Sequence, residues 1–214
     1  MVAIPKPAST IILINGEGKV YLTKRPITMK FLGGFYVFPG GSVDASDYEW
    51  TSNRVKNVPA GLTFDTAYFI AAARELFEEV GILLVENMNL TLEEQWEYRL
   101  QLMKHEISFH DFLQKENLVL DLSSVSYIGH RVTPKTSKYR YDTRFFVTKL
   151  PEGQKPIPYE MEVEEAYWTS PEDALKAYRK GEIALVRPTK VSLETLHHYL
   201  NGTGPLQMPK KMYE

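Results

Sequence analysis

Residues 64–84 form the strongest helical pattern in the sequence, and this segment constrains the fold more than any other. Its apolar residues recur with helical spacing and form one stripe: Phe69, Ala72, Ala73, Leu76 and Val80. Asp65 or Thr66 can cap the start of this helix, and Gly81 can end it. A helix of this pattern must bury its stripe, so the chain needs a sheet or further helices to pack against it.

Strand and helix patterns intermix over the rest of the chain, with no repeat and no Pro/Ser-rich linker. Short apolar or alternating runs predict strands, whereas a period of 3.6 residues predicts helices. The expected strands are 9–15, 19–24, 126–132, 143–148 and 163–168, and the expected helices are 92–105, 108–116, 170–180 and 192–200. The sequence therefore predicts one α/β domain over residues 1–214.

Three segments interrupt this pattern. Pro39-Gly40-Gly41 is expected to leave regular structure, because proline has no backbone N–H and both residue types favour turns. Residues 87–122 read as a helical insertion, and residues 201–214 are expected to be a loose tail.

The composition excludes several classes of protein. Lys and Arg total 25 against 27 Asp and Glu, so no overall basic field favours nucleic acid, which we do not expect as a partner. The absence of cysteine excludes disulfides, thiolate metal sites and cysteine nucleophiles, and it fits a cytoplasmic protein. We expect neither a signal peptide nor a membrane span, because no apolar run approaches ~18 residues.

Three carboxylates lie beside the apolar stripe of the 64–84 helix. Glu75, Glu78 and Glu79 stand at i, i+3 and i+4, which places them within roughly 100° of arc. Like charges at this spacing repel, and a divalent cation would relieve the repulsion. Mg²⁺ prefers oxygen ligands and takes a few carboxylates together with substrate phosphates and water. Three glutamates alone would also fit a solvated acidic face.

The surrounding residues favour the metal site. Arg74-Glu75-Leu76-Phe77-Glu78-Glu79-Val80-Gly81-Ile82, with Phe38-Pro39-Gly40-Gly41 upstream, resembles the Nudix box G-x5-E-x7-R-E-U-x-E-E-x-G-U, where U is a bulky aliphatic residue. The resemblance implies a Nudix fold, in which a mixed β-sheet lies between helices. It also implies hydrolysis of a phosphoanhydride bond, with Mg²⁺ or Mn²⁺ held by Glu75, Glu78, Glu79 and a backbone carbonyl at Gly40 or Gly41. Arg74 would pair with a box glutamate and fix its conformation.

The resemblance has one break. Gly41 and Arg74 are 33 positions apart, where the box has 14, so the chain contains an insertion, which we assign to residues 45–62. We expect it to form a loop or short helix beside the active site. The first glutamate of the box has no clean counterpart: counting back from Arg74 reaches Thr66, beside Asp65, while Asp44 and Asp47 follow the glycine pair. The general base is open among Asp44, Glu160, Glu162, Glu164 and Glu165.

A second stretch concerns the substrate. Tyr21-Leu22-Thr23-Lys24-Arg25-Pro26, then Lys30, Gly34 and Phe38-Pro39-Gly40-Gly41, resembles the pattern L-L-T-x-R-S-x3-R-x3-G-x3-F-P-G-G of Nudix enzymes that cleave coenzyme A. All spacings agree, and Tyr21, Pro26 and Lys30 differ in identity. The insertion is similar to that of the mammalian peroxisomal coenzyme A diphosphatases. The resemblance implies cleavage of coenzyme A or its acyl derivatives to 3′,5′-ADP and a 4′-phosphopantetheine, with Arg25 and Lys30 as candidate phosphate-binding residues.

Other functions stay open on the sequence. A Nudix hydrolase of ADP-ribose, dinucleotides or capped RNA would need the same metal helix. A binding module that has lost catalysis, or an isomerase on the same fold, would share the fold but not the reaction. The complete set of Arg74, Glu75, Glu78 and Glu79 favours an enzyme with a small nucleotide derivative as substrate. A homodimer is also open.

Overall fold

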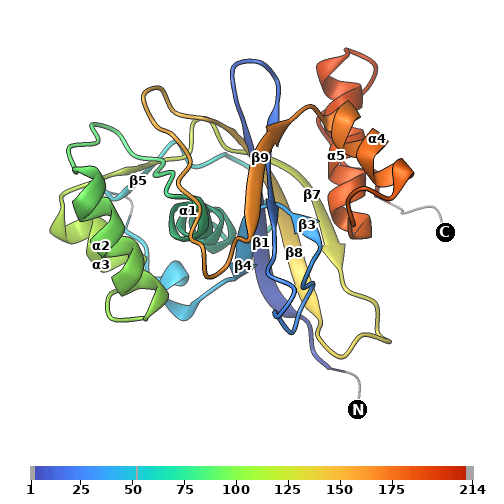
Figure 1. The fold of residues 1–214 in the computed structure, drawn as a ribbon. Coiled ribbons are helices and arrows are strands. Elements are labelled where there is room, and N and C mark those ends of the chain that lie inside the picture. The colour runs from blue at the N-terminus through green and yellow to red at the C-terminus, as the bar shows by residue number, and fades with distance from the viewer. Residues whose placement is uncertain (1–2, 52, 211–214) are drawn as a thin grey trace.

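The computed structural model describes residues 3–51 and 53–210, and Figure 1 shows a central sheet with helices on both faces. The strands are β1 (Lys6–Ile14), β2 (Val20–Lys24), β3 (Tyr36–Val37), β4 (Gly40–Ser42), β5 (Val55–Lys56), β6 (Leu120–Asp121), β7 (Ser126–Val132), β8 (Tyr141–Lys149) and β9 (Glu165–Thr169). The helices are α1 (Ala67–Val80), α2 (Leu92–Met103), α3 (Phe109–Lys115), α4 (Pro171–Lys180) and α5 (Arg187–Leu200), with a 3₁₀ turn at Ala45–Tyr48. No helix in the described part of the chain is long and apolar enough to cross a membrane.

The main sheet is mixed, as the resemblance to the Nudix family implies. Its strand order is β3-β2-β1-β8-β7, with β4 paired to β1 and β9 paired to β2. The central pair, β1 and β8, is parallel and runs in register from Lys6↔Tyr141 to Ile14↔Lys149, whereas β7 and β8 are antiparallel. The α/β fold class with a sheet between helices is therefore confirmed.

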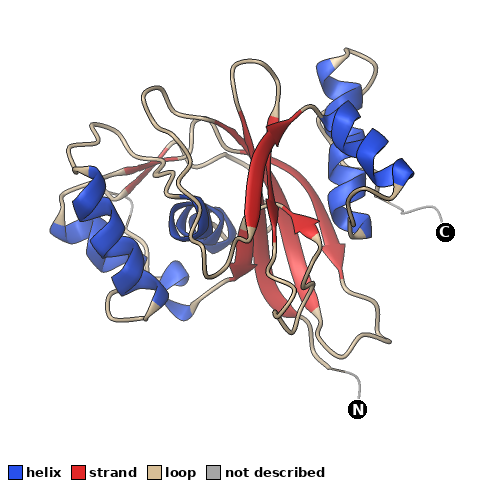
Figure 2. Cartoon of the chain, in the orientation of Figure 1, coloured by secondary structure: helices blue, strands red, loops and turns tan. Residues whose placement is uncertain are grey.

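Alternating residues of β1 divide the interior into two cores. Ile11 and Leu13 point towards α1, whereas Ile12 points towards α4 and α5. Figure 2 shows this division as helices on either side of the strands. The helix with the three glutamates and the helix pair at the C-terminus therefore lie on opposite faces of one sheet.

Helix α1 is more enclosed than its sequence suggests. Phe69 packs against Phe146 of the sheet with ring centroids 4.5 Å apart, while Phe77 stacks on Phe112 of α3 at 5.4 Å. Every residue of α1 except Glu78 is buried. The three glutamates therefore do not form a solvated acidic face, because β4 and the 3₁₀ turn cover the carboxylate side of α1.

Several boundaries differ from those expected. Pro39-Gly40-Gly41 was expected to leave regular structure, but Gly40 and Gly41 belong to β4, because the absence of a side chain lets Gly40 approach the carbonyl of Ser9. Helix α1 ends at Val80, where Gly81 adopts φ 73°, and Ile82 to Leu84 continue as buried coil. Helix α5 begins at residue 187 instead of 192.

The C-terminal segment also departs from the expectation. Met208 is buried against the sheet, and its N–H donates to the carbonyl of Ile128 at 2.6 Å. Met208 and Gln207 therefore attach this segment to β7, so it is not a loose tail up to residue 210, although most of its residues are exposed. Residues 211–214 lie outside the described part of the chain.

The 45–62 segment lies outside the main sheet, as expected. It contains the 3₁₀ turn at Ala45–Tyr48 and strand β5, which pairs with β6 in a separate two-stranded sheet. The strand itself was not expected. The 3₁₀ turn brings Asp47 to Arg74 of α1.

Candidate active site

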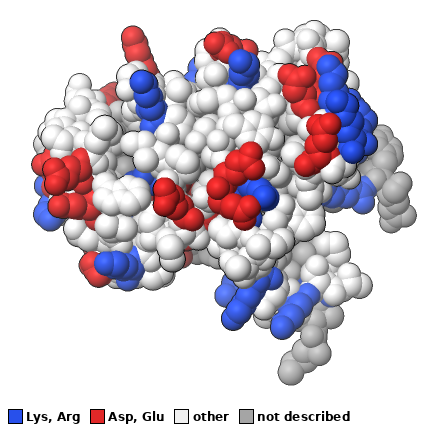
Figure 3. All heavy atoms as spheres, in the orientation of Figure 1, with Lys and Arg blue, Asp and Glu red and all other residues white. Residues whose placement is uncertain are grey.

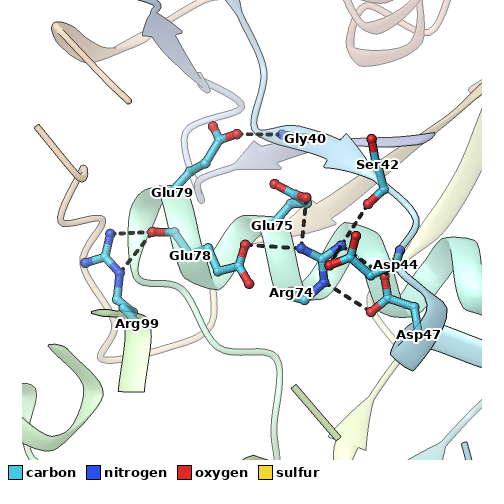
Figure 4. A network of polar contacts seen from close by, with 9 residues as sticks. All are labelled: Gly40, Ser42, Asp44, Asp47, Arg74, Glu75, Glu78, Glu79 and Arg99. Atoms are coloured by element: carbon cyan, nitrogen blue, oxygen red, sulfur yellow. Dashed lines mark hydrogen bonds and ion pairs between the residues drawn. The ribbon is translucent and has the colours of Figure 1, made fainter. Parts of the chain in front are cut away.

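Arg74 is the centre of a buried polar network on α1 (Figure 4). Its Nε and Nη2 donate to the two carboxylate oxygens of Asp47 at 3.1 and 2.9 Å. Its Nη1 donates to Glu75 at 2.9 Å and to Glu78 at 3.1 Å, and Nη2 also donates to the carbonyl of Ser42 at 2.8 Å. Burial lowers the pKa of Arg74, but the surrounding carboxylates outweigh this effect and hold it above its ordinary value. The guanidinium therefore fixes Glu75 and Glu78, the pairing that the sequence implied.

Asp47 is the residue that the sequence reasoning left unresolved. It is 1% exposed and comes six positions after Gly41, which is the spacing that the Nudix box gives its first glutamate. Counting back from Arg74 reached Thr66 instead, because the insertion lies between Asp47 and Arg74. Asp65 is not part of the network: it accepts the N–H of Ala67 at 2.8 Å at the start of α1. Counting forward from Gly41 would have found Asp47.

The two glycines of β4 lie directly against the carboxylates. The N–H of Gly40 donates to Oε1 of Glu79 at 3.3 Å. A Cβ on Gly41 would overlap the carboxylate of Glu75. Glycine is required here because the strand approaches α1 too closely for a side chain.

Burial and mutual repulsion raise the pKa of all three helix glutamates. The pKa of Glu75 is raised to about 7, chiefly by burial, with Arg74 opposing the shift. Burial raises the pKa of Glu78 to about 8 in the same way. The pKa of Glu79 lies well above its ordinary value because of burial and the charges of Glu75 and Glu162. Negative charge is concentrated here beyond what Arg74 neutralises.

The structure distinguishes the candidate bases. Glu164 pairs with Lys24 at 2.6 Å, and Glu165 accepts a hydrogen bond from Tyr36 at 2.7 Å. Glu160 is exposed to solvent. Glu162 lies in the segment that packs on the end of α1, where the backbone N–H of Tyr159 donates to the carbonyl of Glu79 at 2.8 Å, and its charge raises the pKa of Glu75 and Glu79. Asp44 lies at the other end of the network, 3.8 Å from Nη2 of Arg74.

The chemistry of this donor set fits a divalent cation. Within residues 3–51 and 53–210 no three carboxylate or histidine side chains converge into a ready-made metal site. The reason is that Glu75 and Glu78 turn towards Arg74 while Glu79 turns towards Gly40. Buried, mutually repelling carboxylate oxygens are nevertheless the ligands that Mg²⁺ and Mn²⁺ prefer. Gly41 lies directly against Glu75, so its backbone carbonyl is a candidate further ligand.

The two candidate phosphate-binding residues lie apart. Arg25 follows β2, its Nε donates to the carbonyl of Phe31 at 3.2 Å, and its charge lowers the pKa of Glu79. It also lines a cavity beside Gly40 and Gly41. Lys30 is exposed in the following loop and does not line this cavity. The structure thus brings Arg25, but not Lys30, to the carboxylates.

Comparison with known proteins agrees with this geometry. A model of the NUDT19 Nudix domain matches residues 50–196, more than half of the chain. The chain belongs to the Nudix family. It is similar to the acyl-coenzyme A diphosphatase NUDT19 of Xenopus laevis, with 25% identity over 86% of this chain and 61% of the relative. The NUDT19 protein of Gallus gallus is 26% identical over 74% of this chain and 55% of its own. The chain thus spans little more than half the length of these Nudix relatives.

Solved structures of the Nudix family show the same fold. The crystal structure of a NUDIX hydrolase from Alicyclobacillus acidocaldarius superposes with a TM-score of 0.85 at 30% identity, covering 98% of this chain and 100% of that one. The NUDIX domain of Shewanella oneidensis NrtR, solved with ADP ribose, gives a TM-score of 0.53 at 11% identity, covering 92% and 90%. The second likeness concerns the fold alone.

Proposed function

We propose that this protein is a metal-dependent pyrophosphohydrolase that cleaves the phosphoanhydride bond of coenzyme A or an acyl-coenzyme A. The observation that carries the proposal is the network in which Arg74 holds Glu75 and Glu78 against β4, with Glu79 and Glu162 beside them. A protein that only binds nucleotides has no need for so many buried carboxylates, whose ionisation is costly without a cation.

Glu75, Glu78 and Glu79, with the backbone of Gly41, are the residues that would hold Mg²⁺ or Mn²⁺. When bound, the cation neutralises diphosphate oxygens and lowers the pKa of water. Arg74 is a positioning residue: it fixes two glutamate side chains without touching the substrate.

The remaining roles fall to Arg25 and Glu162. Arg25 binds the diphosphate, because its charge lies beside Glu79 and the cavity, and a planar guanidinium suits phosphate oxygens. Glu162 accepts the proton of the attacking water, since its segment packs on the end of α1, its charge acts on Glu75 and Glu79, and it makes no ion pair among the described residues. Lys30, exposed on the loop after β2, would reach only the outer part of a bound substrate.

The choice of coenzyme A rests on two supports. The stretch from Tyr21 to Gly41 keeps every spacing of the pattern found in coenzyme A-cleaving Nudix enzymes. Two curated relatives are named acyl-coenzyme A diphosphatases. ADP-ribose, dinucleotides and capped RNA are the alternative substrates of the same site.

A substrate panel tests the proposal. The purified full chain is incubated with coenzyme A, acetyl-coenzyme A, ADP-ribose, a diadenosine polyphosphate and capped RNA, with Mg²⁺, with Mn²⁺ or with excess chelator, and the products are identified by mass. We expect 3′,5′-ADP and 4′-phosphopantetheine from coenzyme A, only with metal. Preference for another substrate would refute coenzyme A, and undiminished turnover in chelator would refute the metal-dependent reaction.

A further inference from the structure

Three segments that are far apart in the sequence meet at one end of the main sheet (Figure 1). They are residues 3–6 at the start of β1, the loop 25–35 between β2 and β3, and the loop 133–140 between β7 and β8. Nη1 of Arg140 donates to the carbonyl of Ala3 at 2.5 Å, and the rings of Phe31 and Tyr139 lie 6.1 Å apart. These contacts join the three segments into one continuous surface, which we call the basic end because of its charges.

The basic end carries cationic side chains that no carboxylate neutralises. Lys6, Lys30, Lys135 and Lys138 are exposed, and none of them makes an ion pair with a described carboxylate. In Figure 3 lysine and arginine gather at the lower end of the molecule without acidic residues among them. The chain as a whole has a formal net charge of −2, so the positive charge is a local feature of this end.

Two carboxylates border the basic end, and both are already paired. Glu164 accepts the backbone N–H of Ile27 at 3.3 Å and pairs with Lys24 at 2.6 Å. Asp142, near the start of β8, pairs with Arg144. Neither carboxylate therefore offsets the charge of the loop lysines, and an anionic surface is favoured at this end.

Large apolar side chains are exposed on the same three segments. Ile4 is 88% exposed and Ile27 is 74% exposed, which makes them two of the three most exposed large apolar side chains in the described part of the chain. Tyr139 and Val132, the latter directly before the second loop, are also exposed. Exposed apolar side chains surrounded by polar residues mark sites of interaction with proteins or membranes. Their combination with basic residues is typical of surfaces that bind anionic lipids.

The basic end also lies beside the candidate active site. Phe31 and Leu32 of the first loop and Thr133 of the second line the cavity at Gly40 and Gly41. A partner that binds the basic end therefore lies next to this cavity.

We propose that the basic end docks on an anionic lipid bilayer, with its lysines at the phosphate and carboxylate groups of the lipids and with Ile4 and Ile27 in the interfacial layer. The proposal goes beyond the proposed function and does not depend on it. Single-stranded nucleic acid is the other common polyanion, but it binds where bases stack on aromatic rings, and the most exposed apolar side chains here are aliphatic. A second copy of the basic end would bring like charges together.

Co-sedimentation of the full chain with lipid vesicles tests the proposal without catalysis. Phosphatidylcholine vesicles are compared with vesicles that also contain phosphatidylserine. We expect binding to the phosphatidylserine vesicles alone at ~0.1 M salt, and its loss at ~1 M salt, where the screening length falls from ~10 to ~3 Å. Equal binding to both kinds of vesicle, or binding to neither, would overturn the proposal.

Charge reversal tests the lysines. Each basic residue near an anionic surface contributes roughly fivefold in affinity, or ~1 kcal/mol. The double substitution Lys135→Glu/Lys138→Glu should therefore weaken vesicle binding on the order of tenfold or more. Lys149→Glu/Lys155→Glu is the matched control, because it makes the same charge change at exposed lysines at the other end of β8 and in the loop that follows. Equal losses in both double variants would show that only overall charge matters, which would refute docking by the basic end.

The isoleucines give the second comparison. Ile4→Ser/Ile27→Ser should also weaken binding to phosphatidylserine vesicles, whereas Leu92→Ser, at a side chain on α2 that is 69% exposed, should not. Melting temperatures establish that all variants are folded. Unchanged binding of Ile4→Ser/Ile27→Ser would refute the insertion of these side chains. If the wild-type protein ignores vesicles but binds single-stranded RNA through Lys135 and Lys138, the partner is nucleic acid and the proposal is wrong.

Discussion

Arg99 of α2 donates two hydrogen bonds to the backbone carbonyl of Glu78, from Nη2 at 2.9 Å and from Nε at 3.2 Å. The side chain is 2% exposed, packs over the ring of Trp96 and makes no ion pair with a described carboxylate. Burial lowers the pKa of Arg99 to about 10. The helical insertion therefore holds the last turn of α1, which carries Glu78 and Glu79. The contact is favourable because the Arg99 guanidinium is positive and the carbonyls at the C-terminal end of a helix are negative (Figure 4).

Replacing Arg99 should loosen this turn. We expect Arg99→Met to lower the free energy of unfolding by about 1.5–3 kcal/mol, the usual range for hydrogen bonds to a charged group, and to weaken Mn²⁺ binding. Urea denaturation and Mn²⁺ titration by electron paramagnetic resonance measure the two effects. Lys104→Met at the exposed end of the same helix is the control, and an equal effect of both substitutions would contradict the role of Arg99.

Asp47 and Asp44 offer a matched comparison around Arg74. Asp47 is buried and accepts two hydrogen bonds from Arg74, whereas Asp44 is 37% exposed and 3.8 Å away. Removing one partner of a buried ion pair costs about 3–5 kcal/mol, while an exposed pair contributes about 0–1 kcal/mol. We expect Asp47→Asn to destabilise the protein strongly and lower turnover, with little effect of Asp44→Asn. Denaturation midpoints and kcat/KM of both variants test this, and similar losses would show that Asp47 is not the principal partner.

Substitution of a helix glutamate should lower turnover without lowering the stability of the metal-free protein. In Glu79→Gln the buried charge is removed, so the metal-free protein should be at least as stable as the wild type around pH 8. Turnover should nevertheless fall on the order of 10²-fold, or ~3 kcal/mol. Glu182→Gln, at an exposed glutamate, is the control. A variant that unfolds more readily and keeps its turnover would contradict both expectations.

Features set by local sequence pattern could be predicted from the sequence, whereas features set by packing between distant segments could not. Helix α1, the longer strands β1, β2, β7, β8 and β9, and Arg74 with its glutamates were predictable, because periodicity and motif spacing are local in the sequence. The short strands β3 to β6 were not, because two or three residues carry no periodic pattern. Arg99 was not, because nothing in an ordinary charged helix indicates that one arginine will be buried against another helix. In the sequence Glu162 was one of several carboxylates that could act as the general base. Only the packing of its segment distinguishes it, because the backbone N–H of Tyr159 donates to the carbonyl of Glu79 at 2.8 Å.

The raised pKa values predict how stability depends on pH. The folded protein binds protons on Glu75 and Glu78 more tightly than the unfolded chain, with pKa values of about 7 and about 8. The free energy of unfolding of the metal-free protein should therefore fall as pH rises from the ordinary glutamate range, ~4.3, through these values.

A bound cation should oppose this loss. Because Mn²⁺ binds the ionised carboxylates, the rise in Tm on adding MnCl₂ should be larger at about pH 8 than at about pH 5.5. Calorimetric melting curves with MnCl₂ and with chelator measure the difference. An increase in Tm that is the same at both pH values would indicate that the cation binds elsewhere.

Strand β4 approaches α1 too closely for a side chain at Gly41. A Cβ on Gly41 would overlap the carboxylate of Glu75, so Gly41→Ala must displace Glu75 from its hydrogen bond with Arg74. The φ of Gly41 is not positive, so the backbone itself accepts alanine, and the effect should fall on the site. We expect turnover and Mn²⁺ affinity to fall on the order of tenfold or more, equivalent to ~1.4 kcal/mol. Gly16→Ala is the control, since a Cβ there meets nothing within 4 Å. If Gly41→Ala binds Mn²⁺ and turns over substrate as Gly16→Ala does, Glu75 is not held in its working position by β4.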